Sequence, residues 1–272
     1  MASRILANFP QKSTQLEGKV AQNDGVLIRK HEKLGLVYTP RDNWTFLNDR
    51  QLSEILAPKS SISKTSVTVL NLGAIATTDL CNVHKALSTT SCFGNPEDCA
   101  NPIRKLIDIA AVNTVSTIEN LIGRCLKKIL HVRLALNRPY LESSSYNLQA
   151  QSFMGLHYDK FKNYTVGGSD LFYLIGLNLG VCERYFCFSR LLPNKIAESQ
   201  SGQDTNRLTI DESACGLGTA LQFYSGDPIY RIAIAPLEAY IVPTQCIIHD
   251  GMTNRKGLID KCLFIACQFH DN

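Results

Sequence analysis

After Pro139 the chain becomes a succession of short runs rich in β-branched and aromatic residues, and this pattern restricts the possible fold more than any other feature. Turn signals separate the runs, among them Gly167-Gly168 and Gly251. Many short strands at such spacing are typical of a sandwich or barrel. The runs are YNLQAQSF, LFYLIGLNLG, RYFCFS, TALQFYS, IYRIAIAP, AYIVP, CIIHD and CLFIACQF.

In the first half of the chain, the capping residues and the spacing of apolar residues predict helices. Asn48 is a suitable cap for a short helix at about 48–57. Asn101-Pro102, a capping residue followed by proline, precedes apolar residues at helical spacing and predicts a helix that runs to about residue 136. Residues 64–80 fit a strand or a helix. We expect one α+β domain over 1–272, with a mostly helical region at 1–139 packed on a β-rich core at 140–272.

Composition limits the partners and the compartment. The net charge is +4 and no run of five or six basic residues occurs, so no nucleic-acid partner is expected. No apolar window is long enough for a membrane helix, and the first residues lack the apolar segment of a secretory signal. Most of the ten cysteines lie in apolar runs, where cysteine acts as a small hydrophobic residue. These features favour a cytoplasmic protein with free thiols. They leave the oligomeric state open.

Two of the six histidines lie in β-rich runs beside an acidic residue. His157 and Asp159 are two residues apart in the run GLHYD, and side chains with that spacing share one face of a strand. His249 lies near the end of the β-rich half, in the run CIIHD. Two imidazoles and one carboxylate form the facial set that binds Fe(II) and leaves other positions open. The sequence therefore predicts a catalytic metal site at these three residues.

Short patterns also arise by chance, and most His-x-Asp pairs are surface polar residues. Here the pair opens the β-rich half of the chain and the second histidine lies near its end. A further strand, headed by Lys261, follows that histidine. The order favours a metal site, with a non-catalytic β-barrel binding module as the alternative.

From Tyr146 to Phe269 this order resembles the Fe(II)- and 2-oxoglutarate-dependent oxygenases, whose core is a double-stranded β-helix of the jelly-roll or cupin type. In that superfamily one strand carries His-x-Asp and a later strand carries a distal histidine. The run LNLG followed by RYFCFS, and the run PLEAYIVPTQCIIHDG, are similar to AlkB-like and prolyl-hydroxylase-like members. The resemblance implies that His157, Asp159 and His249 bind Fe(II).

The superfamily also binds the far carboxylate of 2-oxoglutarate through an Arg or Lys about ten residues after the distal histidine. Lys261 lies slightly beyond that spacing, at the head of a strand, and Arg255 lies in the turn before it. We favour Lys261, because a strand holds a side chain more rigidly than a loop. It shares one face with Leu263, Ile265, Cys267 and Phe269, and an ammonium heading that row needs an anionic partner. Tyr146 and Gln149 are further candidate contacts for 2-oxoglutarate.

The resemblance implies a hydroxylase. Related halogenases replace the carboxylate ligand by Gly or Ala, whereas Asp159 is present here. The implied reaction consumes O2, converts 2-oxoglutarate to succinate and CO2, and oxidises a C–H bond of a small molecule. The chain also resembles natural-product and toxin tailoring enzymes of this superfamily, which favours a small polar metabolite as substrate. An AlkB-like nucleic-acid dealkylase is the alternative with the same chemistry, and it would need a basic groove.

Overall fold

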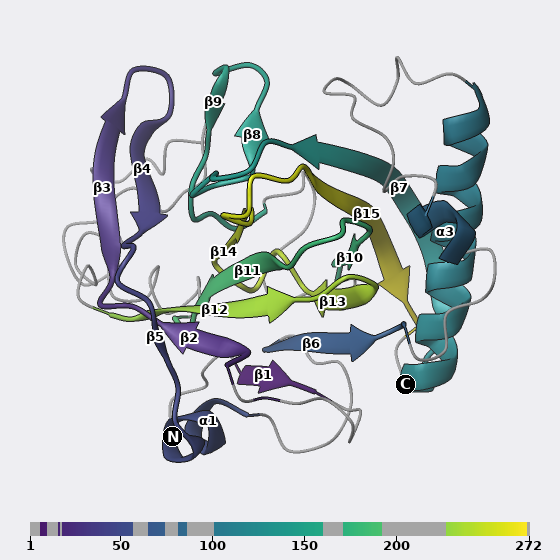
Figure 1. The fold of residues 1–272 in the computed structure, drawn as a ribbon, viewed down its shortest axis with the longest axis horizontal. Helices are drawn as coiled ribbons and strands as arrows, with labels where there is room; N and C mark the ends of the chain where they lie inside the picture. Colours follow the sequence, from purple (N-terminus) through teal and green to yellow (C-terminus); the bar gives the residue numbers. More distant parts are fainter. Residues whose placement is uncertain are drawn as a thin grey trace, which may run out of the picture.

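The computed structural model describes residues 6–9, 16, 18–56, 65–73, 81–85, 101–159, 171–191 and 227–270. Its main feature is a pair of β-sheets (Figure 1). The larger sheet has six strands in the order β1-β6-β13-β10-β15-β7, all antiparallel pairs except β1 with β6. These strands span Leu6–Asn8, Ser66–Asn71, Glu238–Val242, Tyr173–Asn178, Asp260–Phe269 and Leu126–Asn137, in the order of the sheet.

The smaller sheet has five strands in the order β14-β11-β12-β2-β5, and every pair in it is antiparallel. Two hairpins, β3–β4 and β8–β9, stand apart from both sheets (Figure 1). The strands of the smaller sheet span His249–Met252, Arg184–Ser189, Ile229–Ile234, Val20–Gln22 and Thr45–Phe46, in the order of the sheet. The hairpins consist of Val26–His31 with Gly35–Pro40 and of Tyr146–Asn147 with Ser152–Phe153.

Strands β10 to β15 pass back and forth between the two sheets, with β10, β13 and β15 in one and β11, β12 and β14 in the other. This exchange of strands between two facing antiparallel sheets is the arrangement of a jelly roll. A cluster of buried apolar side chains from both sheets fills the space between them, including Phe186, Ile232, Tyr240 and Val242. The β-rich core predicted for the second half of the chain is therefore present.

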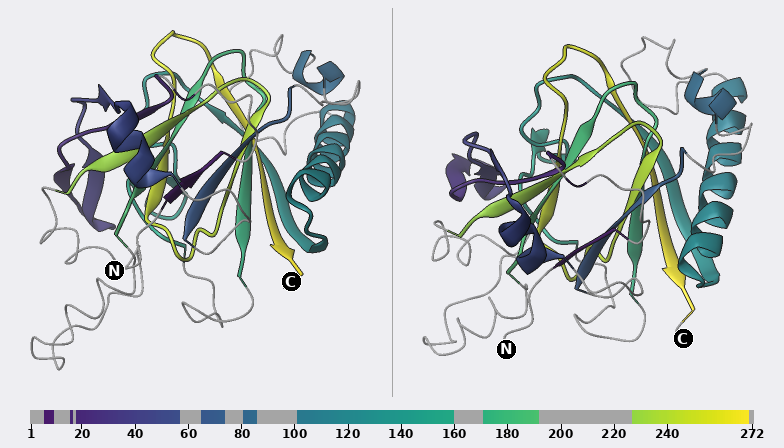
Figure 2. Two further views of the ribbon diagram at one scale, coloured as in Figure 1. Left: turned by 90° about the horizontal axis from the view of Figure 1, so that it is seen from below. Right: turned by 60° about the horizontal axis from the view of Figure 1, so that its bottom comes forward.

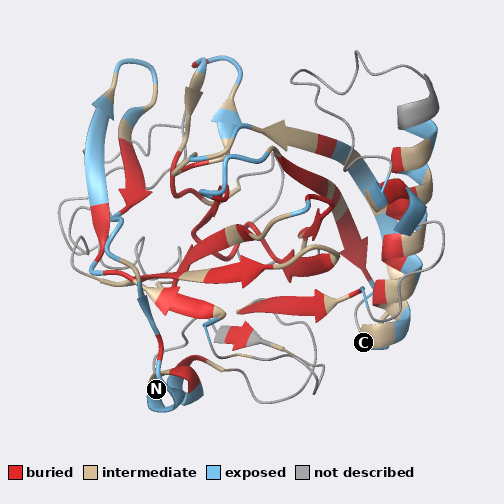
Figure 3. Ribbon diagram, in the orientation of Figure 1, coloured by how far each residue is buried: buried red, intermediate tan, exposed pale blue. Residues whose placement is uncertain are grey.

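The outer face of the larger sheet is covered by helix α3, Asn101–Ile122 (Figures 1 and 2). Its buried residues Ile107, Ala111 and Ile118 belong to one cluster with Leu263 and Ile265 of β15. Figure 3 shows buried residues along the helix face that meets the sheet and exposed residues on its far side. β15 is consequently buried on both of its faces.

The first half of the chain differs from its prediction. Helix α1, Asp49–Ile55, forms as expected, with Asn48 and Gln51 in a reciprocal capping box. Helix α3 begins at the predicted cap but ends at residue 122, because Gly123 adopts a φ of +64° that terminates a helix. Residues 126–137 form β7. A mostly helical region at 1–139 is therefore wrong for the described residues, which also include strands β1 to β6.

Other expectations remain predictions. The run TALQFYS and the polar stretch 195–211 lie outside the described residues. A single domain over 1–272 stays a prediction. In the described part of the chain, no helix is both long and apolar enough to cross a membrane. The seven cysteines for which the structure gives a state are free, as the sequence predicts.

Candidate metal centre

His157, Asp159 and His249 lie together at one end of the space between the sheets. One ligand atom from each side chain lies within 4.8 Å of the other two. The two imidazole rings are 4.6 Å apart between centroids, and His157 Nε2 lies 3.9 Å from Asp159 Oδ1. Both histidines are 5% exposed, whereas the Asp159 side chain is 33% exposed. The three residues thus form a group that can hold a metal ion, with the carboxylate on its open side.

Hydrogen bonds fix the orientation of both imidazoles. His157 Nδ1 lies 2.7 Å from the Gly155 carbonyl oxygen, and His249 Nδ1 lies 2.9 Å from the Ile247 carbonyl oxygen. A carbonyl oxygen only accepts, so each Nδ1 donates and each neutral ring keeps its lone pair on Nε2. Nε2 is the atom of each ring left to bind a metal. A backbone carbonyl on the other nitrogen is the usual support for a metal-bound histidine.

The backbone brings the two histidines together directly. His157 and His249 form an isolated antiparallel bridge, with N–H···O distances of 3.0 and 2.7 Å. The Asp159 amide donates to the Thr244 carbonyl at 3.0 Å, which holds the segment after His157 against the turn that leads to His249. These hydrogen bonds hold two chain segments that are far apart in sequence in a fixed register. The side chains of His157 and His249 are therefore brought together.

Gly155 sets the approach of this segment. Its φ is +71°, and a Cβ there would lie 2.3 Å from the Tyr38 carbonyl oxygen. The same carbonyl accepts from the Leu156 amide at 2.7 Å. Only glycine combines this dihedral angle with such close backbone contact. Its own carbonyl then receives the Nδ1 proton of His157.

Burial favours the neutral form of His249, which is the form that binds a cation. The pKa of His249 is lowered to about 4, mainly by burial and then by neighbouring His157, against an opposing effect of Asp159. His249 is therefore neutral at physiological pH. Asp250, the next residue, is fully buried, and burial raises its pKa to about 6.

A cavity of about 260 Å³ opens over the three residues. Part of its wall is apolar and comes from the facing sheets, and part is polar and comes from β7 and the segment around Ser144. The apolar part includes Leu174, Phe186, Tyr240, Phe264 and Ala266; the polar part includes His131, Arg133, Ser144, Ser145 and Tyr146. The cavity thus combines dry walls with several groups able to bind a polar molecule.

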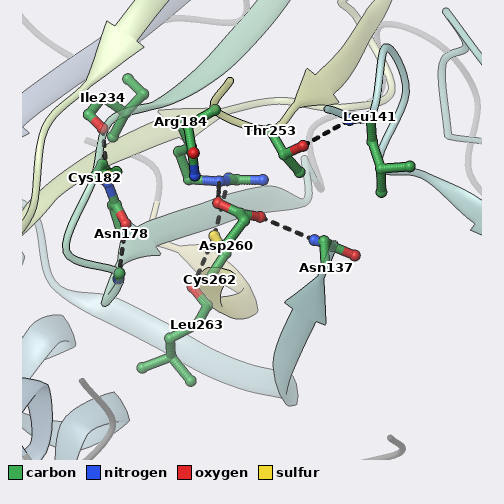
Figure 4. Close-up of polar contacts among 12 residues, drawn as sticks. Asn137, Leu141, Asn178, Cys182, Arg184, Ile234, Thr253, Asp260, Cys262 and Leu263 are labelled. Atoms are coloured by element: carbon green, nitrogen blue, oxygen red, sulfur yellow. Dashed lines mark hydrogen bonds and ion pairs between the residues drawn. The ribbon is translucent and has the colours of Figure 1, made fainter. Parts of the chain in front are cut away.

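A buried guanidinium lies at the other end of the same interior. Arg184, the first residue of β11, is 0% exposed, and its Nε donates to Asp260 Oδ1 at 3.1 Å (Figure 4). Its Nη1 donates to Cys262 Sγ at 3.0 Å and lies 3.4 Å from the Tyr240 hydroxyl. Asn137 donates to the second oxygen of Asp260 at 3.0 Å. Burial lowers the pKa of Arg184, but Asp260, Cys262 and Tyr240 together outweigh that effect and the net pKa is raised, so the charge is permanent.

One donor of this guanidinium is unused. Arg184 Nη2 is buried and has no hydrogen-bond partner. It lies 3.2 Å from the position that a Cβ would take on Gly251, a residue of the cavity wall. Gly251 and His249 share one face of β14, about 7 Å apart along the strand. The unused donor therefore lies about that far from the metal group.

Lys261 does not face the cavity, which corrects the sequence prediction. On β15 the cavity residues are Phe264 and Ala266, whereas Leu263 and Ile265 pack toward α3. Strand alternation puts Lys261 in the row of Leu263 and Ile265. The predicted row is thus correct, but it faces the helix. The residue of β15 that points inward near this position is Asp260, which binds Arg184.

The other residues predicted to contact 2-oxoglutarate lie in different parts of the structure. Tyr146 lines the cavity from β8. Gln149 is exposed in the turn between β8 and β9 and is not among the cavity residues. Arg255 pairs with Asp42 at 2.7 Å and lines a different pocket. Neither Gln149 nor Arg255 meets the metal group in this structure.

Sequence reasoning gave no role to Arg184 or Arg133. Arg184 heads the run RYFCFS, so its signal was of the same kind as that of Lys261, a cation at the start of an apolar strand. Arg133 lies in a stretch that was predicted to be helical. That prediction gave no reason to place it opposite Phe264 of β15, where the structure has it. Pairing between distant strands, which no local pattern encodes, brings both arginines to the cavity region.

No family model matches the chain, and no curated protein matches it. Among solved structures it is similar to the Kdo hydroxylase KdoO, a non-haem Fe(II) alpha-ketoglutarate-dependent dioxygenase, in complex with cobalt(II). That likeness has a TM-score of 0.43 and 14% identity over 74% of this chain and 79% of that chain. It is also similar to AviO1 from Streptomyces viridochromogenes Tue57, with a TM-score of 0.40 and 12% identity over 74% of this chain and 86% of that one.

Proposed function

We propose that this protein is a non-haem iron oxygenase that uses 2-oxoglutarate and O2 to hydroxylate a C–H bond of a small polar metabolite. The observation that carries the proposal is the convergence of His157, Asp159 and His249, whose ligand atoms lie within 4.8 Å of one another at a cavity. Two neutral imidazoles and one carboxylate are the ligand set typical of such enzymes.

The residues present fit Fe(II) in type and in orientation. Both histidines hold Nδ1 in a hydrogen bond to a carbonyl and leave Nε2 toward the group, so neither ring has to turn to bind a metal. Within the described part of the chain the group offers three protein ligands, which leaves room for other molecules at the same ion. When bound, iron would activate O2, which is the oxidant; 2-oxoglutarate would supply two electrons and leave as succinate and CO2, and the substrate C–H bond would supply the other two.

Arg184 is the proposed anchor for the far carboxylate of 2-oxoglutarate. Its unused Nη2 is a buried donor without a partner, a position that favours binding of an oxygen atom. The guanidinium lies about 7 Å along the sheet from His249, and a five-carbon dicarboxylate spans a similar length. Asp260, Cys262 and Tyr240 orient the guanidinium and leave that donor free.

The cavity favours a polar substrate. His131, Arg133 and Tyr146 lie at its exposed rim, and Ser144 and Ser145 add hydroxyl groups. Its volume of about 260 Å³ is small even for a drug-sized ligand. The walls formed by Phe186, Tyr240 and Phe264 exclude water from the deep part, which holds a substrate C–H bond in a dry place.

Natural-product tailoring is the finer proposal, with the last hydroxylation in cylindrospermopsin biosynthesis as the specific reaction to test. It rests on the resemblance seen in the sequence and on the polar rim of the cavity. The AlkB-like alternative would use the same iron chemistry on alkylated bases. Among the described residues, the cavity rim holds one arginine and one histidine, which is less than a nucleic-acid groove requires.

The test is iron-dependent turnover of 2-oxoglutarate. Purified protein is loaded anaerobically with Fe(II) and exposed to O2 with 2-oxoglutarate, and succinate and O2 consumption are measured. The substrates offered are guanidinium- and sulfate-bearing alkaloids on one side and alkylated oligonucleotides on the other. We expect succinate formation that the alkaloid arm stimulates and the oligonucleotide arm does not.

His249→Ala is expected to abolish this turnover, and His31→Ala on hairpin β3–β4 serves as the matched histidine control. No succinate from iron-loaded wild-type protein would leave the non-catalytic binding module as the better reading. Robust dealkylation without a response to alkaloids would instead promote the nucleic-acid alternative.

A further inference from the structure

A second pocket lies on the outer face of the smaller sheet, separate from the metal centre. Its volume is about 240 Å³, and Tyr185 of β11 and Met252 of β14 form part of its floor. Their neighbours Phe186 and Gly251 face the metal cavity, so alternation along both strands puts the two pockets on opposite faces of the sheet. The whole lining is Asp42, Trp44, Tyr185, Arg231, Met252, Thr253 and Arg255.

Arg231 lies in this pocket between two aromatic rings. Its guanidinium carbon is 4.5 Å from the ring centroid of Trp44 and 4.6 Å from that of Tyr185. Both rings contact the guanidinium within cation–π range, and its N–H groups remain available for hydrogen bonds in the plane of the group. Among the described residues, no ion pair or hydrogen bond is found for these groups.

Burial adds to the need for a partner. The pKa of Arg231 is lowered by burial, and Arg255 acts in the same direction, while Tyr185, Cys187 and Asp42 oppose them. A partly desolvated cation without a hydrogen-bonded anion is unfavourable unless something binds to it. The planar N–H edge suits the two oxygens of a carboxylate, sulfate or phosphate.

A second donor in the pocket is also without a partner. Trp44 Nε1 is buried and makes no hydrogen bond, although a buried indole N–H usually has an acceptor. Arg255 brings another positive charge, and Asp42, which pairs with it at 2.7 Å, offsets one of the two. The pocket therefore has a net charge of +1 from two arginines and one aspartate.

We propose that this pocket binds an oxyanion, namely the carboxylate, sulfate or phosphate group of a small metabolite, through Arg231 and the Trp44 indole. Its volume lies below the range of drug-sized ligand sites, which suits a small anion or the anionic end of a larger molecule. The site is independent of the metal centre and of the reaction proposed there. The competing reading is that Arg231 only holds the Asp42–Trp44 segment on the sheet.

Trp44 is the single tryptophan of the chain, so selectively excited tryptophan fluorescence reports on this pocket. The full-length, metal-free protein is titrated with potassium phosphate, sulfate and acetate, each against potassium chloride at the same ionic strength. We expect a saturable change in Trp44 emission with at least one oxyanion and none with chloride. The anion that binds most tightly shows whether the pocket prefers a phosphate, sulfate or carboxylate group. Equal responses to all salts, or no response, would overturn the proposal.

Three variants separate binding from structure. Arg231→Gln is expected to weaken the anion at least ~10-fold, the usual loss for a charge-assisted hydrogen bond. Arg29→Gln on β3 removes the same charge from an exposed ion pair outside the pocket and should leave the affinity unchanged. If Arg231→Gln fails to fold, Arg255→Gln removes the second cation without touching the aromatic stack and should weaken the anion several-fold. Unchanged affinity in the folded pocket variants would show that Arg231 acts only as a structural contact.

Discussion

The two ends of the space between the sheets are built differently. At the metal end, His157, Asp159 and His249 stand on an isolated bridge and a short strand, and the carboxylate is one-third exposed. At the guanidinium end, Arg184 and Asp260 begin two regular strands, and both side chains are 1% exposed. One end is open, so molecules can enter and leave. The other end is closed, and its charge has a fixed position.

This difference teaches what each end contributes. At the metal end, burial keeps His249 neutral, so a cation binds without displacing a proton from that residue above its pKa of about 4. The guanidinium end keeps a permanent charge through its ion pair. We expect mutations at the metal end to affect metal binding first, and mutations at the guanidinium end to affect stability and 2-oxoglutarate first.

The largest effect is expected at the metal end. His157→Ala removes one of three ligands and should lower the affinity for Fe(II) or Co(II) by more than ~100-fold, beyond the loss seen for outer contacts of metal sites. Anaerobic calorimetry with Co(II) measures this. The free energy of unfolding of the metal-free protein should change little by comparison. Metal affinity close to that of wild type would remove His157 from the site.

At the guanidinium end, Arg184→Met should destabilise the protein by roughly 3–5 kcal/mol, because it leaves Asp260 buried without its cation. The melting temperature should also stop rising when 2-oxoglutarate is added. The double variant Arg184→Met/Asp260→Asn removes both charges and should recover much of the stability without recovering the response to 2-oxoglutarate. If the double variant still responds, the anchor lies elsewhere, and Arg133 at the cavity rim is the next residue to test.

Gly155→Ala tests how the backbone supports the metal end. The added Cβ would lie 2.3 Å from the Tyr38 carbonyl oxygen, and the φ of +71° is strained for alanine. We expect a loss of about 1–3 kcal/mol in stability and ~10-fold or more in metal affinity, since the Gly155 carbonyl orients His157. Gly35→Ala is the matched control, with a φ of +72° and no atom within 4 Å of the added Cβ. Equal effects of the two variants would mean that the dihedral strain alone matters.

The metal end should respond to pH through His249 and its neighbour Asp250, whereas the permanent charge of Arg184 should not. Between about pH 4 and 6.5, His249 is neutral when folded and protonated when unfolded, so it makes the metal-free protein more stable as pH rises. Asp250 has its pKa raised to about 6, so its contribution falls as pH rises from 3.8 to 6 and offsets that of His249. Asp250→Asn should therefore expose a rise of up to ~1 kcal/mol per pH unit between pH 4 and 6, measured by urea unfolding. If the free energy of unfolding of this variant did not change with pH, the opposing contributions of His249 and Asp250 would be contradicted.

The smallest effect is expected for Lys261→Met. Lys261 faces α3 rather than the cavity, so the KM for 2-oxoglutarate should stay within about twofold of wild type, whatever happens to stability. Steady-state kinetics on the folded protein measure this. A strong rise in KM would return the anchoring role to Lys261 and contradict the assignment of the two faces of β15.

The sequence alone determined the features that depend on local spacing. The period of two placed His157 with Asp159, and it placed Lys261 with Leu263 and Ile265, because alternation is a property of any single strand. Asn48 and Gln51 encoded the start of α1 through their own side chains. Among the described residues, the runs LFYLIGLNLG, RYFCFS, IYRIAIAP, AYIVP and CLFIACQF overlap strands β10, β11, β12, β13 and β15, as the pattern predicts.

Only the tertiary structure decided which face of each strand points inward. Alternation gives β15 two faces, and α3 covers the one that carries Lys261, while the other meets the metal cavity. The stretch 126–137 was predicted to continue a helix to about residue 136, but pairing with β15 makes it a strand. The unused donor of Arg184 exists because Asp260, Cys262 and Tyr240, from two other strands, occupy the rest of its guanidinium. Such features depend on contacts between segments that are distant in sequence, so they cannot be predicted from local sequence patterns.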